Sequence, residues 1–368
     1  MSRSHRNSPP FRPLLISLAL AASAPGMMHG QAACEGRIAF VSERDGVRGI
    51  WVMQADGSQL RRLTSDPGDG QPVWSPDGAR IAFQATRDAD VRTLDQYGLA
   101  MHRMMYVMDA TGGNLRRLTD TPAASLRWSP DAQHIAFQSS AEDEANWHIE
   151  SVVSNAIYVI DADGRRQRRV TDLEHRHAFA AWSPDSRRVA FASDRDADWE
   201  IYVVDIEGGP ERRLTNRAGP DRYPVWSPDG RLLAYAAGDL AAARAGGPAQ
   251  ATIVVLSLES GAVRHVVRTP ENAVLRAWSP DGRQILFVTN DVLLVDHETG
   301  HVTLITDTPH ARELGSAFLP GASKVAYRSD VDGNWEIYVG GTDGSGRVNV
   351  TNHPADDVLM SVGPCAPR

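Results

Sequence analysis

A short pattern of apolar and polar residues recurs seven times along the chain. Its clearest copy, VWSPDGARIAF at 73–83, places an apolar triplet after a polar turn, and two further strand-like runs follow it. The triplets recur about every 48 residues and begin at Ile38, Ile81, Ile135, Val189, Leu233, Ile285 and Val325. Repeats of this period indicate either a solenoid or the blades of a propeller.

The content of each repeat distinguishes these two architectures. In the fourth repeat, residues 187–193 and 200–205 are rich in β-branched and aromatic residues, as is typical of strands. The segment Ser-Pro-Asp-Gly at 227–230 predicts a tight turn, because proline fixes a negative φ and glycine permits a positive one. Each repeat therefore predicts four strands, and such a small sheet buries both faces only by packing against its neighbours. We predict an all-β fold with a single β-propeller of seven four-stranded blades, or six if one degenerate repeat is not a blade.

Both chain ends are predicted to share one blade. Residues 358–362 match the tryptophan strand of the other repeats, and Cys34 matches the turn residue Asp77, so the C-terminal strand should join the N-terminal blade and close the ring. Cys34 and Cys365 are the only cysteines, and we predict a disulfide between them. Tryptophans are expected to pack between blades at positions 74, 128, 182, 226 and 278. In the two degenerate repeats, Phe318 and Met360 are expected to take the place of the tryptophan.

The first 33 residues differ from the rest of the chain. Three arginines precede an apolar run at 14–24, and small residues follow, a pattern typical of a secretory signal peptide. We predict a signal peptide over 1–33 and a propeller domain over 34–368. No other segment has eighteen consecutive apolar residues, so no integral membrane span is expected. The protein should be periplasmic or secreted; the alternative is a lipid anchor on Cys34.

Charge argues against nucleic acid as a partner. The formal net charge is −8, and removal of the signal peptide with its three arginines changes it to −11. A protein this acidic repels phosphate backbones.

The segments WSPDG, IAF, IYV and RRLT resemble the β-propeller repeats of the TolB-like family, over about residues 35–363. The resemblance implies the propeller fold. It does not choose a function, because propellers of this family also accompany serine peptidase domains and form oligogalacturonate lyases. The repeats here begin almost directly after the signal peptide, so TolB's N-terminal α/β domain is not expected.

Insertions indicate where a partner would bind. With strands named A to D from the axis outward, the B–C loops and D–A connections emerge on one face, and the length variation falls on that face. Insertions concentrated on one face of a repeat protein commonly mark its binding surface. The predicted partner-binding residues come from the first two insertions and are Asp88, Asp90, Arg92, Tyr97, His102, Arg103, Glu144, Trp147 and His148. A third insertion, at 238–250, is rich in alanine and glycine.

Histidines of the D–A connections are candidate ligands of a metal ion. His175 and His177 are two residues apart, so both should point the same way in an extended segment, which suits metal ligation if His310 and His353 converge with them. The acidic segments 194–200 and 330–336 are interpreted as β-turns, because a calcium loop needs twelve residues with glycine sixth.

We expect no catalytic residues, since no GxSxG motif occurs and neither cysteine is placed as a nucleophile. The leading hypothesis is an exported, non-catalytic and monomeric scaffold without cofactor that binds a protein or an envelope glycan. The alternative is a metal-assisted carbohydrate-active enzyme of the oligogalacturonate lyase type, with a divalent metal held by the four histidines.

Overall fold

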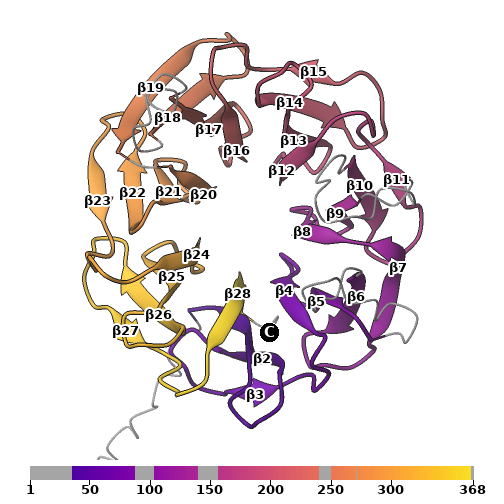
Figure 1. The fold of residues 1–368 in the computed structure, drawn as a ribbon, viewed down its shortest axis with the longest axis vertical. Helices are drawn as coiled ribbons and strands as arrows, with labels where there is room; N and C mark the ends of the chain where they lie inside the picture. The colour runs from indigo at the N-terminus through magenta and orange to yellow at the C-terminus, as the bar shows by residue number, and fades with distance from the viewer. Residues whose placement is uncertain (1–34, 88–102, 140–155, 240–249, 271, 366–368) are drawn as a thin grey trace, which may run out of the picture. The chain divides into compact units, whose positions relative to one another are not determined.

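The computed structural model describes residues 35–87, 103–139, 156–239, 250–270 and 272–365. The regular elements of these residues are 28 β-strands, which form seven antiparallel sheets of four strands each. The sheets stand around a common axis as the blades of a propeller (Figure 1). The prediction of seven blades is confirmed.

Each blade runs from an innermost strand A to an outermost strand D. The first blade contains β28 (Asp357–Gly363), β1 (Arg37–Ser42), β2 (Gly49–Gln54) and β3 (Arg61–Arg62). The next two contain β4 (Gly70–Trp74), β5 (Arg80–Ala85), β6 (Met104–Asp109) and β7 (Arg116–Pro122), then β8 (Ala124–Trp128), β9 (His134–Ser139), β10 (Ala156–Asp161) and β11 (Arg168–Arg169).

The fourth and fifth blades contain β12 (His177–Trp182), β13 (Arg188–Ser193), β14 (Glu200–Asp205) and β15 (Arg212–Arg213), then β16 (Asp221–Trp226), β17 (Leu232–Gly238), β18 (Ala251–Ser257) and β19 (Val263–Thr269). The last two contain β20 (Val274–Trp278), β21 (Gln284–Val288), β22 (Val292–Asp296) and β23 (Val302–Leu304), then β24 (Glu313–Phe318), β25 (Lys324–Ser329), β26 (Glu336–Gly341) and β27 (Val348–Asn349).

The ring closes as predicted, because β28 pairs antiparallel with β1 inside the first blade. One detail of the prediction was wrong. The register places Val362 opposite Ile38, just as Trp128 lies opposite Ile135, so Val362 and not Met360 occupies the tryptophan position. A β-bulge interrupts the pairing of strands A and B in every blade, and the sequence pattern does not reveal how residues are counted across it.

The tryptophans bridge neighbouring blades. The indole Nε1 of Trp128 donates a hydrogen bond to the carbonyl of Val73 in the preceding blade, at 3.1 Å. Trp182, Trp226 and Trp278 make the same bond to their preceding blades. These four buried side chains therefore fix their blades to the preceding ones, and they pack between blades as expected.

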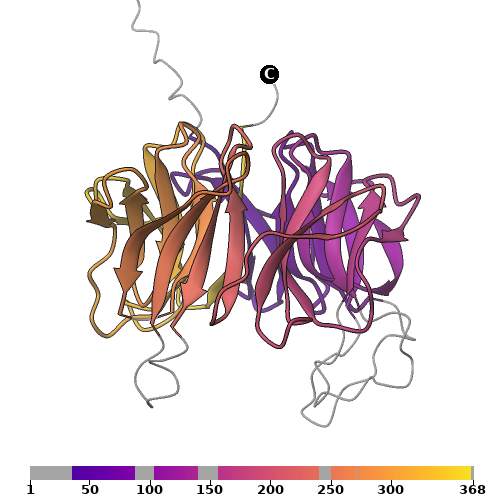
Figure 2. The same ribbon diagram turned by 90° about the horizontal axis from the view of Figure 1, so that it is seen from above.

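The propeller has two different ends. Short A–B and C–D turns form one, here called the turn face, and the D–A connections form the other, here called the loop face (Figure 2). Every strand A starts at the loop face, so residues early in strand A lie near it. In the part of the chain that the structure describes, we find no helix with the length and apolarity needed to cross a membrane.

Candidate functional site on the loop face

A buried polar residue marks the start of strand A in five blades, five residues before the tryptophan position. These residues are at most 2% exposed and are Asp69, His177, Asp221, Glu313 and Asp357. Three of the carboxylates bind an arginine: Asp357 with Arg44, Asp69 with Arg87, and Asp221 with Arg217. We call these pairs the strand A clasps. They join the start of the innermost strand to an arginine of a loop on the loop face.

The clasp of the fifth blade is electrostatically strained. Burial raises the pKa of Asp221 to about 7, and the neighbouring carboxylate of Glu200 adds to the rise, although the ion pair with Arg217 opposes it. Arg217 Nε lies 2.7 Å from Asp221 Oδ1, whereas Oδ2 is buried without a hydrogen-bond partner among the described residues. One arginine therefore does not compensate the loss of hydration of this carboxylate.

His177 occupies the clasp position of the fourth blade and needs a carboxylate from elsewhere. Asp172 supplies it: Oδ1 lies 3.2 Å from His177 Nε2 and 3.1 Å from His175 Nδ1, and Oδ2 lies 3.2 Å from Arg195. Burial alone would raise the pKa of Asp172, but hydrogen bonds to the two histidines and the charge of Arg195 lower it to about 2. Burial lowers the pKa of His177, which favours the neutral imidazole, although the hydrogen bond to Asp172 acts in the opposite direction.

This arrangement fixes a loop and does not suit a metal ion. Asp172 Oδ1 also accepts hydrogen bonds from the backbone amides of Glu174 and His175, at 3.0 and 3.1 Å, so its lone pairs are used within the protein. His175 and His177 were expected to point the same way, and both contact Asp172. In the repeat alignment His177 lies at the position of the aspartates of the other clasps, which is the signal for its structural place.

The other two histidines lie apart from this group. His310 is exposed in the loop before β24. His353 belongs to the loop before β28, where its amide donates to Glu336 at 2.7 Å and its Nδ1 accepts from the amide of Ala355 at 3.1 Å. Among the described residues, no group of three or more histidine, cysteine, aspartate or glutamate side chains is placed to hold a metal ion. The predicted convergence of four histidines is therefore not found there.

Two half-buried tryptophans stand out on the loop face. Trp199 and Trp335 occupy equivalent positions just before strand C of the fourth and seventh blades. The guanidinium carbons of Arg176 and Arg222 lie 5.4 and 5.3 Å from the Trp199 ring centroid. We call the two tryptophans with their flanking arginines the Trp-Arg frames.

The second frame repeats this chemistry. Arg312 and Arg328 lie 5.0 and 5.5 Å from the centroid of Trp335. Arg312 Nε also donates to Asp330 at 2.7 Å, which orients it over the ring, and Arg176 binds Asp194 in the same way. Such cation–π contacts hold an aromatic surface in one conformation while leaving part of it accessible.

The acidic segments beside these tryptophans are β-turns, as interpreted from the sequence. The amide of Ala197 donates to the carbonyl of Asp194 at 3.1 Å, and that of Gly333 to Asp330 at 3.0 Å. Their carboxylates bind the frame arginines and strand C tyrosines, so they support the Trp-Arg frames.

Comparison with known proteins agrees with this architecture. The family model described as the TolB beta propeller domain matches residues 150–249. A TolB homolog of Chlorobium luteolum is 26% identical over 159 residues, which are 43% of this chain and 31% of that protein. The crystal structure of TolB from Acinetobacter baumannii superposes with a TM-score of 0.54 at 18% identity, covering 90% of this chain and 67% of that one. The chain therefore contains TolB-like β-propeller repeats.

The comparisons do not extend to function. An oligogalacturonate lyase in complex with manganese gives a TM-score of 0.64 at 14% identity and covers 83% of this chain and 86% of that one, which shows a shared fold. The TolB-like propeller spans about a third of the length of the curated relatives it matches. What those proteins do is therefore not transferred by similarity alone.

Of the predicted partner-binding residues of this TolB-like propeller, only Arg103 lies within the described part of the chain. A Cβ added to Gly70 would lie 2.9 Å from Arg103 Nη1, so the guanidinium lies against the start of β4. Burial and repulsion from Arg48 lower the pKa of Arg103. Outside the described residues lie Asp88, Asp90, Arg92, Tyr97, His102, Glu144, Trp147 and His148.

The first and last described strands meet near the turn face. Arg37 pairs with Gly363, and its Nε donates to the carbonyl of Pro364 at 2.8 Å, so the backbones leading to the two cysteines run together. Cys365 is not a free thiol, and Cys34 lies outside the described residues, as does the predicted signal peptide. The disulfide stays a prediction.

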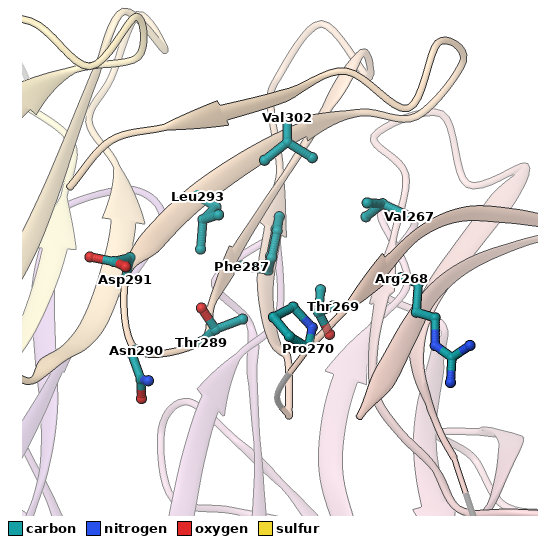
Figure 3. Close-up of a pocket in the computed structure, with 10 residues that line it drawn as sticks. All are labelled: Val267, Arg268, Thr269, Pro270, Phe287, Thr289, Asn290, Asp291, Leu293 and Val302. Atoms are coloured by element: carbon teal, nitrogen blue, oxygen red, sulfur yellow. The ribbon is translucent and has the colours of Figure 1, made fainter. Parts of the chain in front are cut away.

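A pocket of about 290 Å³ lies between the fifth and sixth blades of the propeller. Figure 3 shows Phe287, Leu293 and Val302 forming its apolar side, with Asp291 at one edge and Arg268 at the other. The two charged side chains point away from each other in this view, so they do not converge on a common ligand position. The pocket therefore adds no catalytic arrangement to the site.

Proposed function

We propose that this protein is an exported, non-catalytic scaffold that, as a monomer, binds a protein partner on its loop face. The observation that carries the proposal is the pair of Trp-Arg frames. Tryptophan and arginine are the residues most enriched at the energetic centres of protein interfaces. Two rigid frames on separate blades would anchor one partner at two points.

The polar residues of the face support a non-catalytic role. Asp172 and His177 hold each other, Asp194 and Asp330 hold the frame arginines, and Asp221 holds Arg217. Each of these carboxylates and imidazoles thus has a structural task in the fold. The metal-assisted lyase remains an untested alternative that would need ligands beyond these residues.

Crosslinking from opposite ends of one blade tests the proposal. A photo-reactive amino acid replaces either Glu174, which is exposed on the loop face, or Arg187, which is exposed on the turn face of the same blade. In cells that produce the protein, we expect a protein adduct from position 174 and none from 187. The adduct should disappear in a Trp199→Ala, Trp335→Ala variant that keeps its melting temperature.

The mass of the adduct decides between partners. A peptide-containing adduct identifies the protein by mass spectrometry, whereas a carbohydrate adduct identifies an envelope glycan. Equal adducts from both positions would contradict the assignment of the loop face.

A further inference from the structure

Three arginines gather around the propeller axis. Arg127 lies on β8 and Arg276 on β20, both innermost strands (Figure 1). Arg328 lies on β25, the second strand of its blade, but reaches over the innermost strand: a Cβ added to Gly315 of β24 would lie only 3.1 Å from Arg328 Nε. The missing side chain at residue 315 thus makes room for the guanidinium.

Arg276 is close enough to repel each of the other two side chains. Burial lowers the pKa of all three. Repulsion from Arg127 lowers the pKa of Arg276 further, and Arg276 adds to the lowering of Arg328, whose pKa falls to about 10. They therefore form one continuous group, which we call the axial arginine cluster.

The described residues provide no counter-charge for this cluster. Arg276 Nε and Arg328 Nε are buried without a hydrogen-bond partner, and Arg127 donates only to the carbonyl of Leu126, at 2.9 Å. The buried carboxylates of Asp221 and Glu313 form no ion pair with these arginines and bind other partners through one oxygen each, while Asp221 Oδ2 and Glu313 Oε2 have no hydrogen-bond partner among the described residues. Asp221 binds Arg217, and Glu313 accepts from Thr308 and Ser329 at 2.6 and 3.1 Å.

Such a cluster is unusual in this protein. The chain as a whole is acidic, with a formal net charge of −8, and three of its buried carboxylates at the loop face form ion pairs with arginines. Buried N–H groups in native proteins nearly always have a partner, and a buried like-charge group is destabilising unless something neutralises it. Arg127 remains accessible to water, so a ligand can approach the cluster along the axis.

We propose that the axial arginine cluster binds a small polyanion, whose phosphate or carboxylate groups accept hydrogen bonds from the unpartnered guanidinium N–H groups. The planar fork of arginine matches both kinds of oxyanion. This inference goes beyond the proposed function and does not depend on it.

The spread of the cluster along the axis defines the ligand further. Arg328 pairs with Leu314, four residues before the tryptophan position of its blade, whereas Arg127 is one residue before Trp128. Three residues of strand correspond to about 10 Å. A ligand that contacts both ends therefore carries more than one oxyanion group, as tripolyphosphate and citrate do and inorganic phosphate does not.

Calorimetric titration of the purified protein at low ionic strength tests the proposal with three probes: tripolyphosphate, citrate and inorganic phosphate. We expect at least one of the two polyanions to bind more tightly than inorganic phosphate. Arg276→Met should weaken that binding roughly tenfold or more, the effect of losing one charge-assisted hydrogen bond. Arg276→Lys keeps the charge but loses Nε, so its affinity should lie between those of Arg276→Met and the wild type.

Two controls separate a binding site from a structural or general charge effect. Arg283→Met removes an exposed arginine of the turn face that pairs with Asp296, and it should leave affinity unchanged within about twofold. Without ligand, Arg276→Met should melt at the wild-type temperature or above it, because repulsion is relieved. Preference for tripolyphosphate or for citrate identifies the oxyanion as phosphate or carboxylate.

Three results would overturn the proposal: no binding of either polyanion to the wild type, equal loss of affinity in Arg283→Met, or unchanged affinity in Arg276→Met.

Discussion

Asp221 should make the stability of this propeller depend on pH near neutrality. Its side chain is fully buried, only one of its oxygens has a hydrogen-bond partner within the described ranges, and burial with the nearby Glu200 raises its pKa to about 7. The unfolded chain would have the ordinary value of 3.8. The folded protein therefore takes up a proton that the unfolded chain releases between these two values.

The magnitude follows from linkage. A pKa raised by about 3 units corresponds to about 4 kcal/mol of stabilisation, which is fully present below pH 4 and is lost as the pH rises through about 7. Asparagine resembles the protonated acid and does not titrate. Between pH 4.5 and 7.5, the free energy of unfolding of Asp221→Asn should therefore rise by about 3 kcal/mol relative to the wild type.

Urea denaturation of both proteins at pH 4.5, 6.0 and 7.5 measures this difference. Asp281→Asn is the control. Hydrogen bonds from Ser279 and the amide of Arg283 lower the pKa of Asp281, so it stays ionised throughout the range and its difference from the wild type should be constant. A pH-independent difference for Asp221→Asn would refute the reasoning.

Three further predictions concern other parts of the fold. Without reductant, the mass of the intact protein should be two hydrogens lower than the mass calculated from its sequence, because we expect a Cys34–Cys365 disulfide. By loop entropy this bond stabilises the fold by at most about 5 kcal/mol. A mass increase of the size of a lipid would instead indicate an anchor on Cys34. The His175→Ala, His177→Ala variant should lose about 2–4 kcal/mol of unfolding free energy in urea denaturation, because a buried hydrogen-bonded group is removed. Its metal content by elemental analysis should equal that of the wild type. Loss of a stoichiometric metal would favour the lyase alternative. Gly315→Ala should lower the free energy of unfolding by about 1 kcal/mol, because residue 315 has a φ of +61°. It should also weaken polyanion binding, because the added methyl group displaces the Arg328 guanidinium. Unchanged affinity in calorimetry would contradict that contact.

The repeat pattern was sufficient to predict the blades, because hydrophobic period and turn residues are local properties of the sequence. It also predicted that Trp128 and its equivalents pack between blades, since an indole at a fixed position of the repeat meets the neighbouring blade; the indole hydrogen bonds of four of them were not predicted. The error at Met360 arose where a bulge changes the count between strands. The structural position of His177 was not recognised from the sequence because it was considered beside His175 and not against Asp221 and Asp357, its equivalents in other repeats.

The axial arginine cluster was beyond the reach of such alignment. Arg127, Arg276 and Arg328 occupy three different positions of the repeat, on strands of three different blades, so no periodicity relates them. Only the closed ring brings them together. The contact between Arg328 and Gly315 is likewise a consequence of two adjacent strands and is not visible in either segment alone.

The innermost strands combine a constant backbone with variable side chains, and this explains how one fold can carry different sites. Three residues before the tryptophan position, a positive φ recurs in six blades, at Gln71, Ser125, Phe179, Tyr223, Gly315 and Leu359. Five of the six are not glycine, and each such residue costs of order 1 kcal/mol, so the bulge is maintained by the fold and not by residue preference. The backbone therefore redirects side chains at the same place in each blade whatever they are. Binding chemistry in this propeller should accordingly reside in residues that depart from the repeat, as the axial arginines do, and not in the repeat that identifies the family.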